Sequence, residues 1–145
     1  MTDSIATYMT DDHQRCDHLL AACERAVSGG DWNRLAAQTT DFSKALIGHF
    51  DMEEQILFPE LVAVMPWASG PTGMMTMEHG QMRALVEQLD EAVHAQDADA
   101  CLGILETLHL VTQQHNAKEE GILYPMAEES LGDQTPDILN RLQAG

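Results

Sequence analysis

Apolar residues recur every three to four positions along most of the chain, the spacing of one helix face, and no stretch alternates as a half-buried strand would. The pattern predicts four long helices. The first spans Asp3 to Ser28 and ends at Gly29-Gly30, and the second begins after an N-cap at Asp31. The fourth begins near Ala98. The core-facing stripes of the four helices are Met9, His13, Cys16, Leu20, Cys23 and Val27; Leu35, Phe42, Leu46, His49, Glu53 and Ile56; Met75, His79, Met82, Val86, Leu89 and Val93; and Ile104, Leu108, Val111, His115, Glu119, Ile122 and Met126.

Proline and glycine divide these helices. Pro59 is expected to kink or end the second helix, because it lacks the amide that would bond back to Gln55. Residues 66–73 are predicted to form a loop before the third helix, and the tail, residues 133–145, to hold one short, lightly docked helix. The fold class is therefore all-α, an antiparallel up-down four-helix bundle with a short C-terminal tail, in a single domain of residues 1–145.

The stripes contain groups that an ordinary core avoids. Each stripe carries one histidine, and two of them carry a glutamate one turn later. Ionisable groups in a core cost many kcal/mol unless they satisfy one another, so this arrangement indicates a metal.

Two segments of the chain repeat each other. Residues 49–59 (HFDMEEQILFP) align with residues 115–125 (HNAKEEGILYP) at an offset of 66 positions, with Phe58 in the first copy exchanged for Tyr124 in the second. The same offset places His13 on His79. The chain thus reads as two copies of one αα-hairpin packed about a pseudo-two-fold axis, with a metal-binding core over residues 12–126.

This repeat predicts a two-metal site. In His-x-x-x-Glu the second residue lies about 40° round the helix and about 6 Å along it, so both side chains reach one central spot. Imidazole and carboxylate ligands suit iron, with manganese or zinc as alternatives. A single core histidine is usually only hydrogen-bonded, and one His-x-x-x-Glu is commonly a surface pair; the repeated register favours the metal. The predicted ligands are His13 and His49 for one ion, His79 and His115 for the other, and Glu53 and Glu119 as bridges.

Other polar residues are assigned secondary roles or none. The pairs Glu91–His94 and Glu106–His109 match the Glu-x-x-His spacing of ferritin-like sites, but they and His18 fall away from the core stripes. Cys16 is expected to pack in the core, with a redox role as the alternative. The remaining candidates are Asp17 and Arg83, expected in surface ion pairs or at the site entrance, and Asp12, Glu54, Glu78 and Glu120, which could orient ligand histidines.

Composition bounds the partners. The 24 acidic residues against 7 basic ones give a net charge of −17, which argues against nucleic acid and anionic membrane as partners. No apolar run approaches the ~20 residues of a membrane span and no signal-peptide pattern opens the chain, so we expect a cytoplasmic protein. The three cysteines form no CxxC motif, and Cys16 and Cys23, about 10 Å apart on one helix, cannot pair. This pattern fits free thiols in a reducing compartment.

From Asp12 to about Met126 the chain resembles the hemerythrin-like (HHE cation-binding) domains. The motifs that carry the resemblance are Asp12-His13, His49-x-x-x-Glu53-Glu54 with Leu57-Phe58-Pro59, Glu78-His79, and His115-x-x-x-Glu119-Glu120 with Leu123-Tyr124-Pro125. The resemblance implies a four-helix bundle around two iron ions bridged by carboxylates and an oxo or hydroxo group, used to bind O2 or NO or to handle iron.

Two positions depart from the oxygen carriers of that family. Those proteins have a fifth histidine one turn before the position of His79, where this chain has Met75. Their last carboxylate is usually an aspartate five residues after the fourth-helix histidine, whereas Glu119 lies four after His115. Both features resemble the iron-centre-repair and nitric-oxide-responsive branch more closely.

The leading hypothesis is a protein that binds O2, NO or a related small ligand at an open iron position. The alternative is a di-iron enzyme or iron-handling factor that responds to NO or peroxide or repairs iron-sulfur centres. A third hypothesis is a bundle whose metal serves only stability. We expect a binding protein rather than an enzyme, and the sequence does not identify a protein partner.

Overall fold

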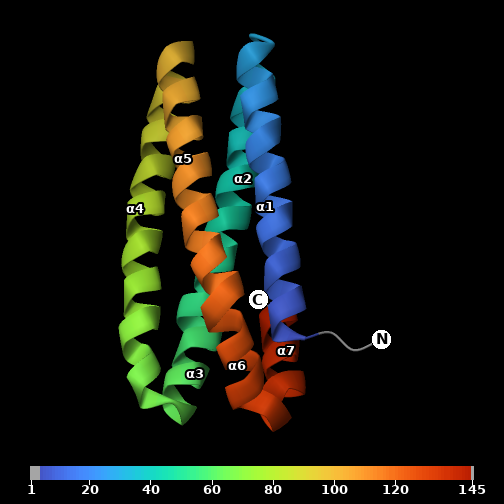
Figure 1. Ribbon diagram of the computed structural model, residues 1–145. Coiled ribbons are helices and arrows are strands. Elements are labelled where there is room, and N and C mark those ends of the chain that lie inside the picture. The colour runs from blue at the N-terminus through green and yellow to red at the C-terminus, as the bar shows by residue number, and fades with distance from the viewer. Residues whose placement is uncertain (1–3, 145) are drawn as a thin grey trace.

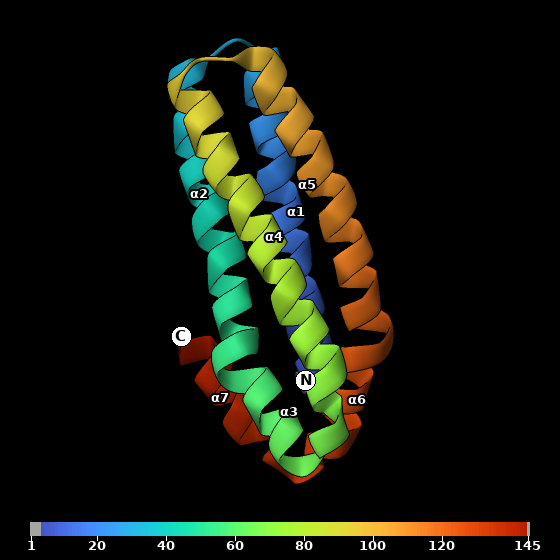
Figure 2. The same cartoon turned by 90° about the vertical axis from the view of Figure 1, so that its left-hand side faces the viewer.

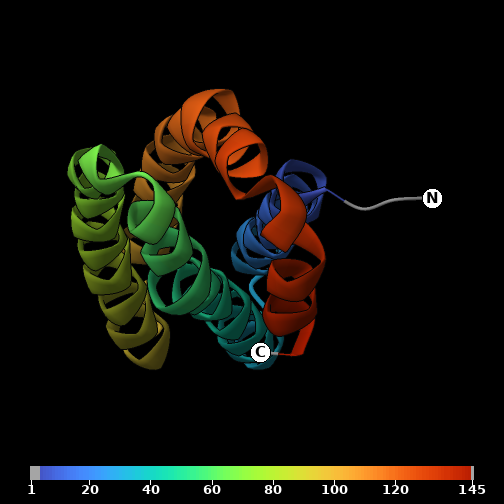
Figure 3. The same cartoon turned by 90° about the horizontal axis from the view of Figure 1, so that it is seen from below.

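The structure, a computed structural model, describes residues 4–144, and every regular element in that range is helical. Four long helices lie side by side: α1 (Ile5–Ser28), α2 (Trp32–Met52), α4 (Ser69–His94) and α5 (Ala98–Lys118). The colour order shows the chain reversing direction from each long helix to the next (Figures 1 and 2). Because α1 and α4 each pack against both α2 and α5, the four helices surround one interior (Figure 3). The predicted all-α fold with four long helices is confirmed.

Local capping explains where the helices begin and end. The carboxylate of Asp31 accepts a hydrogen bond from the N–H of Arg34 at 3.0 Å, as predicted, and Asp97 does the same for Ala100 at 3.1 Å. After α1 the chain turns at Gly30, whose φ of +71° is a conformation that glycine adopts at little cost. The predicted start of this helix at Asp3 lies outside the described residues; α1 begins at Ile5.

The loop predicted over residues 66–73 is wrong. Only a short 3₁₀ turn, Pro66–Ala68, separates α4 from the helix before it, and α4 already begins at Ser69. Pro71 is compatible with this helix because it lies in the first turn, where backbone N–H groups have no acceptor within the helix.

The second long helix does not end at Pro59. A π-helical turn, Glu53–Leu57, follows α2, and the chain continues as α3 (Phe58–Val64) with Pro59 in its first turn. The second repeat copies this arrangement: a π turn, Glu119–Leu123, follows α5 and leads into α6 (Tyr124–Leu131). In both turns the N–H after the turn donates to a carbonyl five residues back. The wider turn accommodates a proline ring that would clash with a standard α turn.

The π turns also change which residues face the core. Ile122 was predicted on the core stripe, but its side chain is 58% exposed, whereas Leu123 is buried. In the first copy Ile56 is only partly buried and Leu57 is buried. A π turn holds more residues than an α turn, so the next core-facing residue comes one position later in the sequence.

The tail forms more than a lightly docked helix. Residues Thr135–Ala144 make α7, which lies beside α1 and the first π turn, outside the ring of four long helices (Figure 3). Its residues Ile138, Leu139 and Leu142 are buried. The tail therefore adds to the core.

The interior has two apolar clusters. One, around Phe42, Leu46 and Leu89, fills the end of the bundle near the α1–α2 connection. The other, around Met9, Leu57 and the buried face of α7, fills the opposite end. The polar residues described next lie where these two clusters meet.

Candidate metal site

All six predicted ligand residues converge in the interior. The four histidines come from the four long helices, one from each, and the two glutamates are the first residues of the two π turns. Each of the six is buried, with an exposed fraction of at most 4%. The π turns therefore begin at the residues that bring carboxylates into the core, in keeping with the frequent occurrence of π turns at functional sites.

The six side chains form two quartets that share both glutamates. One quartet is His13, His49, Glu53 and Glu119, and the other is Glu53, His79, His115 and Glu119. In each, one nitrogen or oxygen per residue lies within 4.8 Å of all the others. This is the arrangement predicted from the 66-residue repeat, with each glutamate offering one oxygen to each quartet.

Unpartnered polar atoms show that the site suits a cation. Oε1 of Glu53, Oε2 of Glu119 and Nε2 of both His79 and His115 are buried and make no regular hydrogen bond within residues 4–144, although Nε2 of His79 lies 2.9 Å from Oε1 of Glu53 and Nε2 of His115 lies 3.2 Å from Oε2 of Glu119. All four belong to the second quartet and surround one spot. Buried polar atoms without partners are rare and costly, and a bound cation would satisfy the four together.

A carboxyl group accepts a hydrogen bond from the outer nitrogen of each of the four buried histidines. The Nδ1–H of each ring donates to an acid at 2.6–2.8 Å, which leaves Nε2 facing the interior. Each of the four acids that we expected to orient a histidine thus hydrogen-bonds one. The pairs are His13 with Glu120, His49 with Asp12, His79 with Glu54, and His115 with Glu78.

The pKa values of three of these orienting acids lie below their usual values. Burial raises the pKa of Asp12, but hydrogen bonds and charges from His49 and Arg15 outweigh it, so the net pKa is below its usual value. Burial also raises the pKa values of Glu54 and Glu78, but Arg83 with His79, and Lys118 with His115, outweigh it and lower both pKa values. An ionised acid on Nδ1 strengthens the imidazole as an electron-pair donor at Nε2.

The pKa values of the two shared glutamates are shifted in opposite directions. Burial and the charge of Glu119 raise the pKa of Glu53 well above its usual range. Burial also raises the pKa of Glu119, but its close contacts with the imidazoles of His115 and His13 outweigh this effect and hold the pKa well below the usual range. Positive charge between the two quartets would allow both carboxylates to ionise.

Tyr124 is a site residue that the sequence reasoning did not identify. Its hydroxyl donates to Oε2 of Glu53 at 2.6 Å and lies 3.0 Å from Oε1 of Glu119. Nε2 of His13 and of His49 lie 3.0 and 3.1 Å from it. Burial and the two carboxylates raise the pKa of Tyr124 well above its usual value. The exchange of Phe58 for Tyr124 in the repeat was the signal that could have found it.

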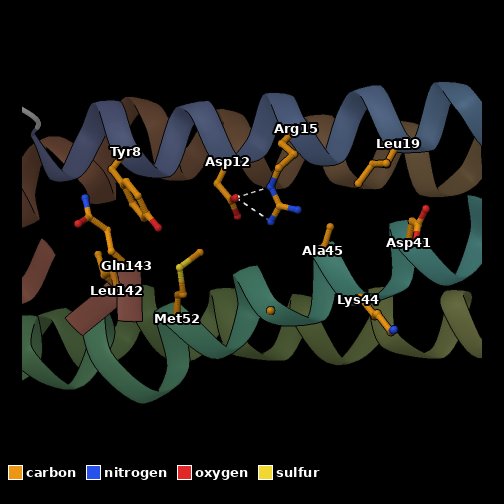
Figure 4. A pocket seen from close by; sticks show the side chains of 11 residues that line it. Tyr8, Asp12, Arg15, Leu19, Asp41, Lys44, Ala45, Met52, Leu142 and Gln143 are labelled. Carbon is orange, nitrogen blue, oxygen red and sulfur yellow. Dashed lines mark hydrogen bonds and ion pairs between the residues drawn. The ribbon is translucent and has the colours of Figure 1, made fainter. Parts of the chain in front are cut away.

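Asp12 connects the site to the surface. One of its oxygens accepts from His49, and the other pairs with Arg15 at 2.9 Å. Figure 4 shows this pair in a surface cavity of about 590 Å³ between α1, α2 and α7, with Tyr8 and Lys44 also on its wall. Of the four orienting acids, only Asp12 lines this cavity.

The histidines rejected from the sequence are outside the site. His18, His94 and His109 are exposed and belong to neither quartet. Arg83 forms an ion pair with Glu54 at 3.0 Å and lies over the ring of Phe50, so it supports an orienting acid from the surface side. Its repeat counterpart Asp17 makes no such pair and accepts a hydrogen bond from Gln113 at 3.2 Å.

The three cysteines are free and buried. Burial raises the pKa of Cys16 to about 12, so its thiol stays protonated at neutral pH. Cys16 is a member of the apolar cluster near the α1–α2 connection, as expected for packing.

The fold and the site define a helical bundle with a buried cation-binding interior. Residues 4–127 match the hemerythrin HHE cation-binding domain, and the chain belongs to this family. The resemblance identified over Asp12 to about Met126 is thereby confirmed. A search of curated proteins and one of solved structures found no match. Across residues 4–144, no helix is long and apolar enough to cross a membrane.

Proposed function

We propose that this chain is a non-haem di-iron protein that binds O2, NO or a related small ligand at an open iron position. The observation that carries the proposal is the pair of buried quartets that share Glu53 and Glu119. Four imidazoles and two carboxylates form a ligand set that suits iron, and the two quartets contain no thiolate.

The pattern of orienting acids supports two repeated αα-hairpins, α1–α2 and α4–α5. Within each hairpin, the acid before the first histidine accepts from the second histidine. Between hairpins, the acid after each shared glutamate accepts from the first histidine of the other hairpin. Because the hydrogen bonds repeat as the sequence does, a pseudo-two-fold axis would relate the two metal positions.

The protein residues would bind the metals, orient the ligands and exclude water. The carboxyl groups that accept from Nδ1 fix each imidazole, and the apolar clusters on both sides limit access of water to the quartets. Bound iron would supply the open coordination position. Four histidines and two bridging carboxylates, even with an added oxo or hydroxo bridge, leave at least one iron short of six ligands.

Anaerobic loading with ferrous iron tests the proposal. The protein is loaded under nitrogen, freed of excess metal and analysed for iron, and its absorption spectrum is recorded before and after O2 or NO is added. We expect two irons per chain and a spectrum that changes with each gas and returns when the gas is removed. If the loaded protein instead turns over NO or peroxide repeatedly, it is an enzyme and not a binding protein. Bound metal that reacts with none of these molecules would contradict both the binding and the enzyme function.

A matched pair of variants on α5 provides the control. His115→Ala removes a proposed ligand, whereas His109→Ala removes an exposed histidine of the same helix. We expect His115→Ala to lose iron and the gas-dependent spectrum, and His109→Ala to retain both. Loss of iron in both variants would mean that the effect does not depend on the proposed ligand set.

A further inference from the structure

We propose that Tyr124 is a direct ligand of the ion held by His13 and His49, so that the two metal positions differ and the small ligand binds at the other one. The inference rests on the proposed function, because it presupposes a metal in each quartet. It adds a fifth protein ligand to one quartet and assigns the open position to the quartet of His79 and His115.

The hydroxyl oxygen of Tyr124 is placed as a ligand would be. It lies 2.6–3.1 Å from one donor atom of each of the four residues in the first quartet. Metal–ligand bonds of about 2.1 Å place neighbouring ligands about 3.0 Å apart and opposite ligands about 4.2 Å apart. Tyr124 is thus spaced as a neighbour of all four donors, as the apex of a square pyramid would be.

The remaining separations fit the base of that pyramid. Nε2 of His13 and Oε1 of Glu119 are 3.0 Å apart, and Nε2 of His49 and Oε2 of Glu53 are 3.5 Å apart, as neighbours. Nε2 of His49 and Oε1 of Glu119 are 4.0 Å apart, close to the separation of opposite ligands. Five protein atoms therefore surround one spot as five ligands of one ion would.

The two quartets also differ in the aromatic residue that the repeat places beside each of them. Where the second copy of the repeat has Tyr124 the first has Phe58, whose ring lies nearly parallel to that of His79, with centroids 6.1 Å apart. Phe58 offers no oxygen, and the four buried atoms without hydrogen-bond partners all belong to the quartet of His79 and His115. The hydroxyl of Tyr124 thus contacts every donor of the first quartet, whereas within residues 4–144 no tyrosine hydroxyl bonds the four unpartnered atoms of the second.

The two positions would differ chemically as a result. Tyr124 would bind as the phenolate, and the proton that it donates to Glu53 without metal would pass to solvent. Tyrosine oxygen is an established iron ligand in proteins and, as an anionic oxygen, suits the ferric ion. With the first ion bound by five protein groups, the second is left with the free position.

Tyrosine-specific spectroscopy tests this assignment. The chain has two tyrosines, so in Tyr8→Phe any ferric-phenolate signal can come only from Tyr124. The variant is loaded with two irons, oxidised to the ferric state, and examined by absorption and resonance Raman spectroscopy. We expect a visible charge-transfer band with enhanced phenolate ring vibrations, and the same signal in the parent. Two bound ferric ions without this signal would overturn the assignment.

A second variant separates ligation from hydrogen bonding. In Tyr124→Phe, loaded and oxidised in the same way, we expect the charge-transfer band and the enhanced phenolate vibrations to be lost, and a variant that binds two ferric ions and keeps these signals would overturn the assignment. In the parent, NO added to the ferrous protein should alter the Mössbauer spectrum of only one of the two irons, and equal changes at both would overturn the placement of the open site. Absence of iron from the parent and from Tyr8→Phe would instead contradict the proposed function.

Discussion

Glu53 and Glu54 are adjacent in the sequence, yet their carboxylates lie in different surroundings. Glu53 is fully buried between the quartets, whereas Glu54 lies partly exposed between His79 and Arg83. Glu119 and Glu120 repeat this difference. The phase of the helix therefore separates a proposed metal ligand from an orienting group within one dipeptide.

This difference predicts unequal effects of substitution. Glu53→Ala and Glu119→Ala should each nearly abolish metal binding, because each removes a ligand shared by both ions. Glu54→Ala and Glu120→Ala should each weaken binding by about 10–100-fold, the usual effect of losing an orienting group. Metal titration of the four variants measures this. Equal losses in all four would show that the inner and outer acids have been assigned wrongly.

Cys16 should react slowly in the folded protein. Burial raises its pKa from the ordinary 9.0 to about 12, which reduces its thiolate population at pH 8 by about a thousandfold. Its alkylation should therefore rise steeply with pH and become fast on unfolding. The rate difference between the parent and Cys16→Ser isolates this thiol. Rapid native-state loss of the Cys16 thiol at pH 8 would favour the redox role instead.

Met75 is one of the two positions where the sequence differs from the pattern expected of the oxygen carriers. It is 3% exposed and, with Met74, Ile122 and Leu123, lines an apolar surface cavity of about 310 Å³. Met75→His should prolong the O2-dependent spectrum and reduce peroxide turnover, because imidazole binds iron better than a thioether does. Met74→His, at a neighbouring exposed position, is the control. If both variants behave as the parent does, Met75 does not control the open position.

At the scale of single residues the sequence predicted the six converging residues, because histidine and glutamate rarely repeat in register on core stripes unless they bind a metal. It did not predict Tyr124. Phe58 and Tyr124 are both large and aromatic, so their exchange reads as ordinary core variation. Only the packed structure places the Tyr124 hydroxyl among the metal-binding atoms.

The π turns are the feature at the scale of elements that periodicity could not predict. A 3.6-residue pattern continued through them assigns Ile122 to the core, where the structure buries Leu123. Pro59 and Pro125 closely follow the π turns, so the prolines did mark where the helices change. The helical turn widens locally there, and the helix does not end. The same limited reading of proline and glycine produced the wrong loop over residues 66–73.

The tail helix gives a prediction about stability. Leu142 is 1% exposed in the cluster shared with α1 and the first π turn. Leu142→Ala should lower the free energy of unfolding by about 2–4 kcal/mol, the usual cost of such a truncation in a core. Asn140→Ala, at an exposed position of α7, should change it by about 0.5 kcal/mol or less. Chemical denaturation of metal-free protein checks both values, and equal small effects would mean that α7 is not part of the cooperative unit.

For the whole molecule, the fold class followed from patterning because each long helix has a continuous apolar stripe. The chain places its buried ionisable groups between two apolar clusters, so that most of the core is conventional. Net charge bounded the partners but indicated no site. The side-chain geometry of the quartets depended on the packing of all four helices and could not be read from any one of them.

Anomalous X-ray scattering at the iron edge, recorded from crystals of the loaded protein, would locate the bound ions without reference to activity. We predict two peaks per chain, one beside His13 and His49 and the other beside His79 and His115, with Glu53 and Glu119 contacting both. A single peak at full loading, or peaks at His94 or His109, would contradict the two-metal site.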